Sequence, residues 1–446
     1  MHARVADKPV DIPESRVVAI WRQCLRDGHE LLTENGEAIR VLYPGRYNGG
    51  SGADFLDAVV ATDRGLLKGD IEVHTRSSGW RQHGHYLDPA YNRVIIHVVY
   101  CNDTNGDIIL SSGRSVPTVT LNKQTGSKSR KDVNAVFLPC RHVIHRLTAD
   151  SIGEILDATG DARFHERSGE FRATSSRSGQ ALYEGIMSAL GYARNKHGFL
   201  KLARHVPLRR LESIISANVS HDECLAIIQS QLLGISGLLP SQRWGEGVID
   251  TGADDWLIRL EGIWRRSGET AVLSAGDWHM SGIRPANLPV RRIAALSYLL
   301  VRYRRFGLLA GLTDDLCQPD NVLTYSELER RLLVGAAGYW KQNLDYRLPA
   351  RKAAPALLGK GRVADIIVNV LLPFVAAGIS EVPAVDIYHS CPRLMVNNLE
   401  RHMLEQLELD PRLVGSARRQ QGLLHIYKTL CSQGKCSECP LNRLSS

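Results

Sequence analysis

The pattern of hydrophobic and polar positions predicts a mixed N-terminal region. Apolar side chains that recur every three to four residues predict a helix over residues 14–27. Alternating or β-branched runs predict strands at 31–33, 38–42, 55–62, 69–75, 93–100 and 116–121, with Asn35-Gly36 as a hairpin turn. The run at 93–100 is nearly continuous in apolar residues, which is typical of a buried central strand. These elements predict an α+β fold, with an α/β domain that ends near residue 125.

The remainder of the chain has a helical pattern. From about residue 150, apolar positions at helical spacing predict helices at 180–190, 222–233, 290–306, 326–343 and 361–377. Residues 123–131 are basic and predict a flexible linker, and residues 162–179 are rich in Arg and Ser and predict a surface loop. We therefore expect an α/β domain (1–125), a linker and loop segment (126–180), an all-α domain (181–390) and a C-terminal helical segment (391–446).

Composition indicates a globular protein with a basic excess. Hydrophobic residues make up 43% and charged residues 23% of the 446 residues, which argues against a disordered chain. The net charge of +8 fits a DNA partner, because Lys and Arg displace counterions from phosphates. Nine cysteines, an odd number, do not suggest a disulfide framework. No signal peptide is evident, and the apolar stretch at 368–379 is short and broken by Asn369 and Pro373, so we expect a cytoplasmic protein.

An acidic and histidine-rich pattern stands on two of the predicted strands. Residues at spacing two share one face of a strand, so Asp70, Glu72 and His74 should point the same way. Asp54 lies where a glycine-rich loop enters the preceding strand, and hairpin pairing would bring it to Glu72. Two adjacent carboxylates repel unless a cation lies between them. Mg²⁺ or Mn²⁺, held by Asp54, Glu72 and Asp70, would activate water against a phosphodiester.

Further polar groups follow this pattern and leave alternatives open. His83, His85 and Asp88 come soon after Glu72 and predict a second metal or substrate site, and His97 interrupts an apolar strand, where it needs a polar partner. A zinc or iron hydrolase built from these histidines is a rival interpretation. A further alternative is structural: the acidic side chains face solvent, one caps a turn, and the buried histidine is a satisfied core residue.

The two strands resemble the PD-(D/E)xK nuclease superfamily. The first motif is Gly52-Ala53-Asp54 and the second is Glu72-Val73-His74, in which His stands in place of the usual Lys. The resemblance implies a restriction-endonuclease-like mixed sheet with flanking helices and a catalytic metal site. It also implies an acidic residue on the first helix, for which Glu14 is the candidate. The catalytic residues expected from the pattern and the resemblance together are Asp54, Glu72, His74 and His97.

The chain as a whole also resembles an uncharacterised bacterial family, a domain of unknown function. The resemblance is carried over nearly the full length by motifs such as Gly69-Asp70-Ile71-Glu72-Val73-His74 and Arg284-Pro285-Ala286-Asn287 followed by Pro289. It implies nothing about activity.

The C-terminus carries a cysteine motif. Cys431, Cys436 and Cys439 have a C-x4-C-x2-C spacing, which suits Zn²⁺ or an iron–sulfur cluster. Cys391 is the expected fourth ligand. The motif resembles the iron–sulfur staple of some DNA-processing nucleases, which favours a 4Fe–4S cluster over zinc. Three free thiols on a flexible tail are the alternative.

Basic residues in the helical region are candidates for contacts with nucleic acid. They are Arg194, Lys196, Lys201, Arg284 and Arg292, and solvated helix faces are the alternative for each. The sequence thus favours a metal-dependent nuclease that acts in DNA processing. Two other functions stay open: a non-catalytic nucleic-acid-binding or scaffold protein with a degenerate nuclease fold, and a histidine-rich metallohydrolase that acts on a small molecule.

Overall fold

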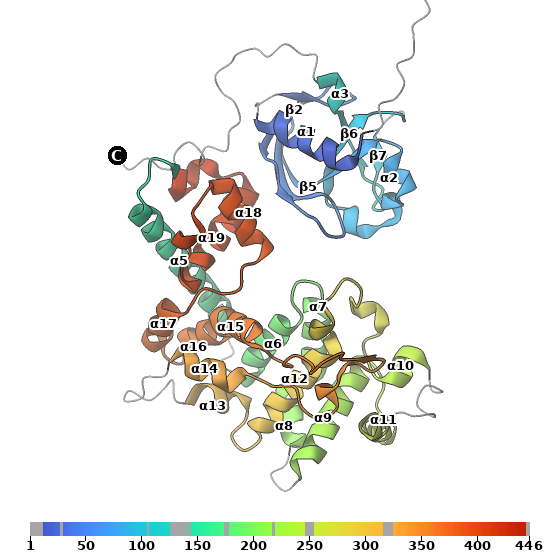
Figure 1. Ribbon diagram of the computed structural model, residues 1–446, viewed down its shortest axis with the longest axis vertical. Coiled ribbons are helices and arrows are strands. Elements are labelled where there is room, and N and C mark those ends of the chain that lie inside the picture. The colour runs from blue at the N-terminus through green and yellow to red at the C-terminus, as the bar shows by residue number, and fades with distance from the viewer. Residues whose placement is uncertain are drawn as a thin grey trace, which may run out of the picture. The chain divides into compact units, whose positions relative to one another are not determined.

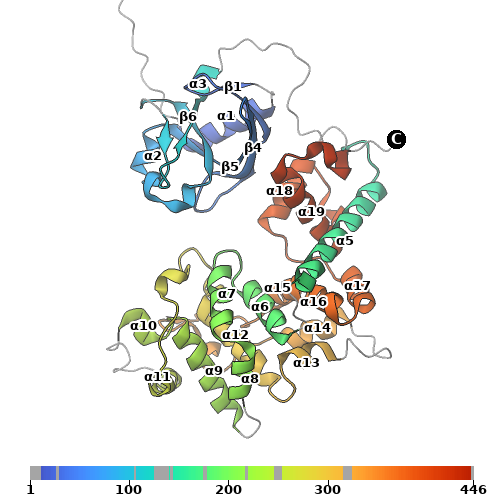
Figure 2. The same cartoon turned by 180° about the vertical axis from the view of Figure 1, so that it is seen from behind.

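The computed structural model describes residues 12–26, 30–104, 107–124, 140, 144–173, 178–215, 219–245, 254–314 and 324–442. These residues form an α+β protein with two compact units (Figures 1 and 2). The sheet unit comprises residues 1–160, 396–415 and 419–446, and the helical unit comprises residues 161–395 and 416–418. The predicted basic linker lies outside the described residues from position 125 to position 131.

The described part of the sheet unit contains a mixed sheet of seven strands in the order β1-β2-β4-β5-β6-β9, with β3 beside β4. The strands β2, β4 and β5 form an antiparallel meander, and β6 and β9 run parallel to β5. The alternating and β-branched runs therefore formed the sheet that they predict. The strands are β1 (Leu31–Leu32), β2 (Ala38–Tyr43), β3 (Arg46–Tyr47), β4 (Phe55–Thr62), β5 (Gly65–Arg76), β6 (Val94–Cys101) and β9 (Thr118–Thr120).

Helix α1 (Glu14–Arg26) covers one face of this sheet, as Figures 1 and 2 show from opposite sides. Its Val17 and Trp21 are fully buried and join a core that includes Ile71 and Val73 of β5 and Val98 of β6. In β5 these apolar residues alternate with Glu72 and His74, which therefore lie on the opposite face. The alternation thus buries the apolar positions under α1 and leaves the polar positions to build a site.

The crossover from β5 to β6 is short and irregular. It contains α2 (Gly79–Gln82) and the 3₁₀ turns η1 (His85–Leu87) and η2 (Pro89–Tyr91). The parallel register then places Glu72 opposite His97. The unit also contains a small hairpin and a short helix, namely β7 (Ile108–Ile109), β8 (Ser115–Val116) and α3 (Leu121–Gln124).

C-terminal residues complete the sheet unit. Helices α18 (Asn398–Leu407) and α19 (Ala417–Thr429), followed by the turns η10 (Cys431–Gln433), η11 (Cys436–Glu438) and η12 (Pro440–Asn442), form a core with Tyr43 and Val59 of the sheet. The unit thus extends beyond the boundary expected near residue 125. It takes in most of the segment from residue 391 onward that we expected to be separate, because the sheet carries apolar side chains on this side as well.

The helical unit has its own large apolar core. It contains α6 (Gly179–Leu190), α7 (Lys196–His205), α8 (Leu208–Ile214), α9 (His221–Ile235), α10 (Pro240–Trp244), α11 (Asp255–Ser267), α12 (Pro289–Arg302), α13 (Leu308–Thr313), α14 (Tyr325–Leu332), α15 (Lys360–Ile366), α16 (Leu372–Gly378) and α17 (Glu381–Ser390). The π-helical segment η8 (Ile367–Leu371) joins α15 to α16. The 3₁₀ turns of this unit are η4 (Ala275–Asp277), η5 (Pro285–Asn287) and η7 (Gly338–Lys341), whereas η9 (Pro411–Leu413) belongs to the sheet unit. A two-stranded ribbon pairs β10 (Asn343–Asp345) with β11 (Leu348–Pro349).

The loop expected over residues 162–179 is wrong for most of its length. Helix α5 (Ala149–Ala173) runs through it, and positions 174–177 lie outside the described residues. The buried apolar side chains of α5 are few, and beyond residue 161 Phe164 is the buried hydrophobic residue. The surrounding Arg and Ser residues masked this sparse pattern, because a helix with few apolar positions gives little periodic signal.

Two helical runs in the described chain, 221–244 and 360–378, are long and apolar enough to cross a bilayer by length and composition. Within the protein, 89% of the first window and 67% of the second are buried. Burial of this extent is typical of core helices, which satisfy the same test.

Candidate functional site

Asp54 and Glu72 converge at the start of β4. The backbone N–H of Asp54 donates to Glu72 Oε2 at 3.1 Å, and the N–H of Val73 donates to Asp54 Oδ2 at 3.0 Å. Burial, followed by the nearby charge of Glu72, raises the pKa of Asp54 to about 7. Two carboxyl groups are therefore held close together in a partly desolvated place, where a cation would relieve their repulsion.

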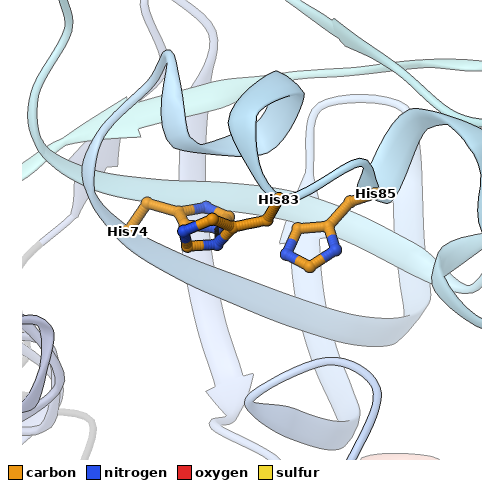
Figure 3. Close-up of side chains that lie close together, drawn as sticks. All are labelled: His74, His83 and His85. Atoms are coloured by element: carbon orange, nitrogen blue, oxygen red, sulfur yellow. Dashed lines mark hydrogen bonds between the residues drawn. The ribbon is translucent and has the colours of Figure 1, made fainter.

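Three histidines gather beside Glu72. One side-chain nitrogen from each of His74, His83 and His85 lies within 4.8 Å of the other two. Figure 3 shows the three imidazole rings close together. Glu72 Oε1 lies 3.3 Å from His85 Nε2 and 3.7 Å from His74 Nε2. His74 comes from β5, whereas His83 ends α2 and His85 begins η1. The irregular crossover thus folds back over the strand and supplies two of the three imidazoles.

His97 contacts His74 on the buried side of the cluster. It is fully buried, and its Nε2 lies 2.9 Å from Nδ1 of His74, while Nε2 of His74 lies 3.1 Å from Nδ1 of His83. Burial, followed by the nearby imidazoles, lowers the pKa of His74 to about 2 and that of His97 to about 3. Both rings are therefore neutral at pH 7, the form in which imidazole binds metals. If Nδ1 of His74 carries its proton toward His97, Nε2 of His74 is left as a lone pair facing the cluster.

One side of the cluster is buried and the other side is exposed to solvent. His74 and Glu72 are buried, His85 is partly exposed, and His83 is exposed to solvent. The ring of Tyr91 stacks on His85 with 3.9 Å between the ring centroids. Glu14, in the first turn of α1, has a pKa raised by burial, lowered in part by His83 and raised further by Glu72, so its carboxyl group lies near the same cluster. A ligand could therefore enter from the side of His83.

Two predicted ligands are engaged elsewhere. Asp70 accepts a hydrogen bond from the N–H of Asp57 at 3.0 Å and lies 3.4 Å from Nη2 of Arg93. Its partner Asp57 lies where the pairing of β4 with β5 shifts register, between Phe55 and Ala58. Asp88 caps η2 by accepting from the N–H of Ala90 at 2.8 Å. Both positions thus have a structural role apart from the histidines.

The predicted nucleic-acid-binding residues all lie in the helical unit and differ in their exposure to solvent. Arg292 is buried, and its guanidinium group donates to the Leu357 carbonyl, the Tyr192 hydroxyl and Asn287. This interior position corrects the expectation that Arg292 contacts phosphates. Lys201 is partly buried and pairs with Asp277 at 3.0 Å. The side chains that are exposed are Arg194, Lys196 and Arg284.

The C-terminal cysteines meet a residue that sequence reasoning missed. Cys431, Cys436 and Cys439 surround one small cavity of the sheet unit together with Cys140. Cys391, which we expected to complete the group, belongs to the helical unit, where it is 1% exposed and burial raises its thiol pKa to about 12. Cys140 lies far from the motif in sequence, and no other cysteine is near it in the chain. The sequence around it therefore gave no sign of a metal ligand.

These features define a class: an α+β protein whose mixed sheet carries a carboxylate and histidine cluster and whose second unit is helical. The chain belongs to the family described as "Protein of unknown function (DUF2851)", whose profile matches residues 14–401. The match contains all residues of the histidine cluster, as well as Cys140. Searches among curated proteins and among solved structures returned no match.

Proposed function

We propose that this protein is a metal-dependent hydrolase that cleaves phosphodiesters in nucleic acid. The observation that carries the proposal is the convergence of Asp54 and Glu72 beside His74, His83 and His85. Carboxylate and imidazole ligands together favour Mn²⁺ or Zn²⁺ over Mg²⁺, which prefers oxygen ligands. Such an ion supplies a water of lowered pKa and neutralises the charge that develops on the phosphate.

The chain's own residues would orient this chemistry. Glu72 lies on the buried side of the cluster and would hold the ion together with the imidazoles, and His97 would fix the ring of His74. Asp54, with its raised pKa, would lose its proton when a cation binds and then act as a second carboxylate ligand. His83 is exposed, so the ion would face solvent and substrate on that side. The net charge of +8 supports a nucleic-acid substrate.

The test is cleavage of plasmid and single-stranded DNA, and of RNA, by the full chain with Mn²⁺, Zn²⁺ or Mg²⁺. We expect metal-dependent cleavage that Glu72→Gln reduces by at least about a thousandfold, since a ligand of the catalytic ion is lost. The matched control is Asp63→Asn, an exposed acid in the turn between β4 and β5. Equal cleavage by the wild type and Glu72→Gln would overturn the proposal, and tight DNA binding without cleavage would favour a scaffold.

A second candidate function is hydrolysis of a small molecule by a zinc ion. The grouping of three histidines favours it, because three protein ligands with one open position are typical of catalytic zinc sites. Turnover of small activated phosphate or carboxylate esters, without cleavage of DNA or RNA, would select this function. Loss of that turnover in His83→Ala would then place it at the same cluster.

A further inference from the structure

The four cysteines around the cavity of the sheet unit come from two distant parts of the chain. Cys140 precedes the entire helical unit in sequence, and the other three follow it on the turns η10 to η12. Cys140, Cys431 and Cys439 are buried, and Cys436 is partly exposed. All four side chains therefore line one cavity.

N–H donors reach two of these sulfur atoms. Gln406 Nε2 donates to Cys431 Sγ at 3.7 Å. The backbone N–H groups of Leu441 and Asn442 donate to the sulfur of Cys439. N–H groups directed at sulfur stabilise the deprotonated form, and such outer contacts are typical of metal-bound ligands.

We propose that Cys140, Cys431, Cys436 and Cys439 form a metal centre with four thiolate ligands. Zinc and an iron–sulfur cluster share this ligand chemistry, and neither would need a residue from the helical unit. The centre would fix the C-terminal turns on the sheet, where Gly434 packs against Val59 and Lys68 Nζ donates to Gln433 Oε1 at 2.8 Å. The inference is independent of the hydrolytic function, since these cysteines lie apart from the histidine cluster in the core that contains Tyr43 and Val59.

The first experiment measures metal content in the full chain carrying His83→Ala and His85→Ala, which removes the histidine cluster as a source of metal. The protein is purified without oxygen and analysed for zinc, iron, acid-labile sulfide and visible absorption. We expect either about one zinc per chain and no colour, or a brown protein with equal iron and sulfide. Neither metal in substantial amount would overturn the proposal.

The second experiment separates Cys140 from Cys391. In the same background, Cys140→Ser should lower metal content roughly tenfold or more, as Cys436→Ser does, because a ligand is lost. Cys391→Ser is the matched control, a buried cysteine of the helical unit that should leave metal content unchanged. The reverse result, with metal retained in Cys140→Ser and lost in Cys391→Ser, would overturn the assignment.

A third measurement on the unmodified chain guards against unfolding of the variants. Each cysteine is mapped by alkylation and mass spectrometry before and after a chelator removes the metal. Alkylation should rise together at the four proposed ligands and stay constant at Cys224 and Cys391. A chelator that changes nothing, or a disulfide among the four, would contradict a thiolate centre.

Discussion

The position of the His74 ring depends on a glycine. A Cβ atom added at Gly79 would lie 2.8 Å from Cδ2 of His74, and this imidazole is 2% exposed and held by two hydrogen bonds. Gly79→Ala should therefore displace the ring and weaken Mn²⁺ binding by about tenfold or more. Calorimetric titration measures the affinity, with Gly169→Ala on α5 as the control, since a Cβ there meets open space. Unchanged Mn²⁺ affinity in Gly79→Ala would show that His74 is not a ligand of the metal.

His97 should act as a positioning residue. It is buried and contacts the ring of His74. Because this contact fixes the His74 ring, His97→Ala should lower Mn²⁺ affinity by about 10- to 100-fold without loss of the fold. The side-chain oxygen in His97→Asn could accept from Nδ1 of His74 and should restore part of the affinity. His402→Ala, which removes a partly buried histidine bonded to Tyr43, controls for the loss of an imidazole packed in the sheet unit. Equal loss in both alanine variants would indicate a general effect on folding.

The sequence predicted those site residues whose geometry follows from strand periodicity. Glu72 and His74 share a face because side chains alternate along β5, and Asp54 reaches them through the antiparallel hairpin. Asp70 obeys the same spacing, yet it is engaged by Arg93 and by the N–H of Asp57, which lies at a shift of register between β4 and β5, and such an irregularity has no periodic signature. Cys140 could not be found because its neighbours in space come from the other end of the chain.

At the scale of elements, an ion pair links α5 to α17 and α19 within the helical unit. Asp161 on α5 accepts hydrogen bonds from Arg418 and from His389, the latter at 3.0 Å, and Arg418 Nε donates at 2.8 Å. Burial acts to raise the pKa of Asp161, but these hydrogen bonds outweigh it and lower the pKa below its ordinary value. The paired carboxylate therefore stabilises the fold above the pKa of the unfolded chain.

This linkage predicts a pH-dependent cost of Asp161→Asn. Near neutral pH the variant should lose about 1 kcal/mol of unfolding free energy, because the group is partly exposed and solvent screens the pair. The difference from the wild type should shrink as the pH falls below about 4, where the carboxyl group of the unfolded chain takes up its proton, and vanish below the lower pKa of the folded state. Urea unfolding near neutral pH and at acidic pH measures this difference in unfolding free energy. Asp386→Asn, at an exposed position on α17, is the control. A constant difference across this range would exclude the ionised pair as its cause.

Helix limits were predicted well where a capping or terminating signal was present. The expected helix at 222–233 corresponds to α9, which Ser220 caps by accepting from the N–H of Glu223. The helix expected over 326–343 instead ends at Leu332, because Gly335 and Gly338 follow, and Gly338 adopts a φ of +52°. Apolar spacing continued through these glycines and extended the prediction too far.

At the scale of the whole molecule, the sheet unit is built from both ends of the chain. Met403, Leu407 and Leu423 of the C-terminal helices are buried in one core with Tyr43 and Val59 of the sheet. Local sequence patterns predict each element separately, but they do not report which distant segments share a core. The boundary expected near residue 125 was based on the order of elements along the chain. The core of the sheet unit instead combines segments that the helical unit separates in sequence.

This organisation predicts different behaviour of two fragments. Residues 161–395 contain nearly all of the helical core and should fold alone, with a single cooperative thermal transition by circular dichroism. Residues 1–160 lack the C-terminal helices, so Tyr43 and Val59 would be exposed to water, and the fragment should aggregate or bind a hydrophobic dye. Adding residues 396–446 in trans should restore solubility, because these residues supply the missing apolar surface. A soluble, cooperatively unfolding 1–160 fragment would instead show that the sheet needs no C-terminal cover, and the single core described for this unit would have to be divided into two.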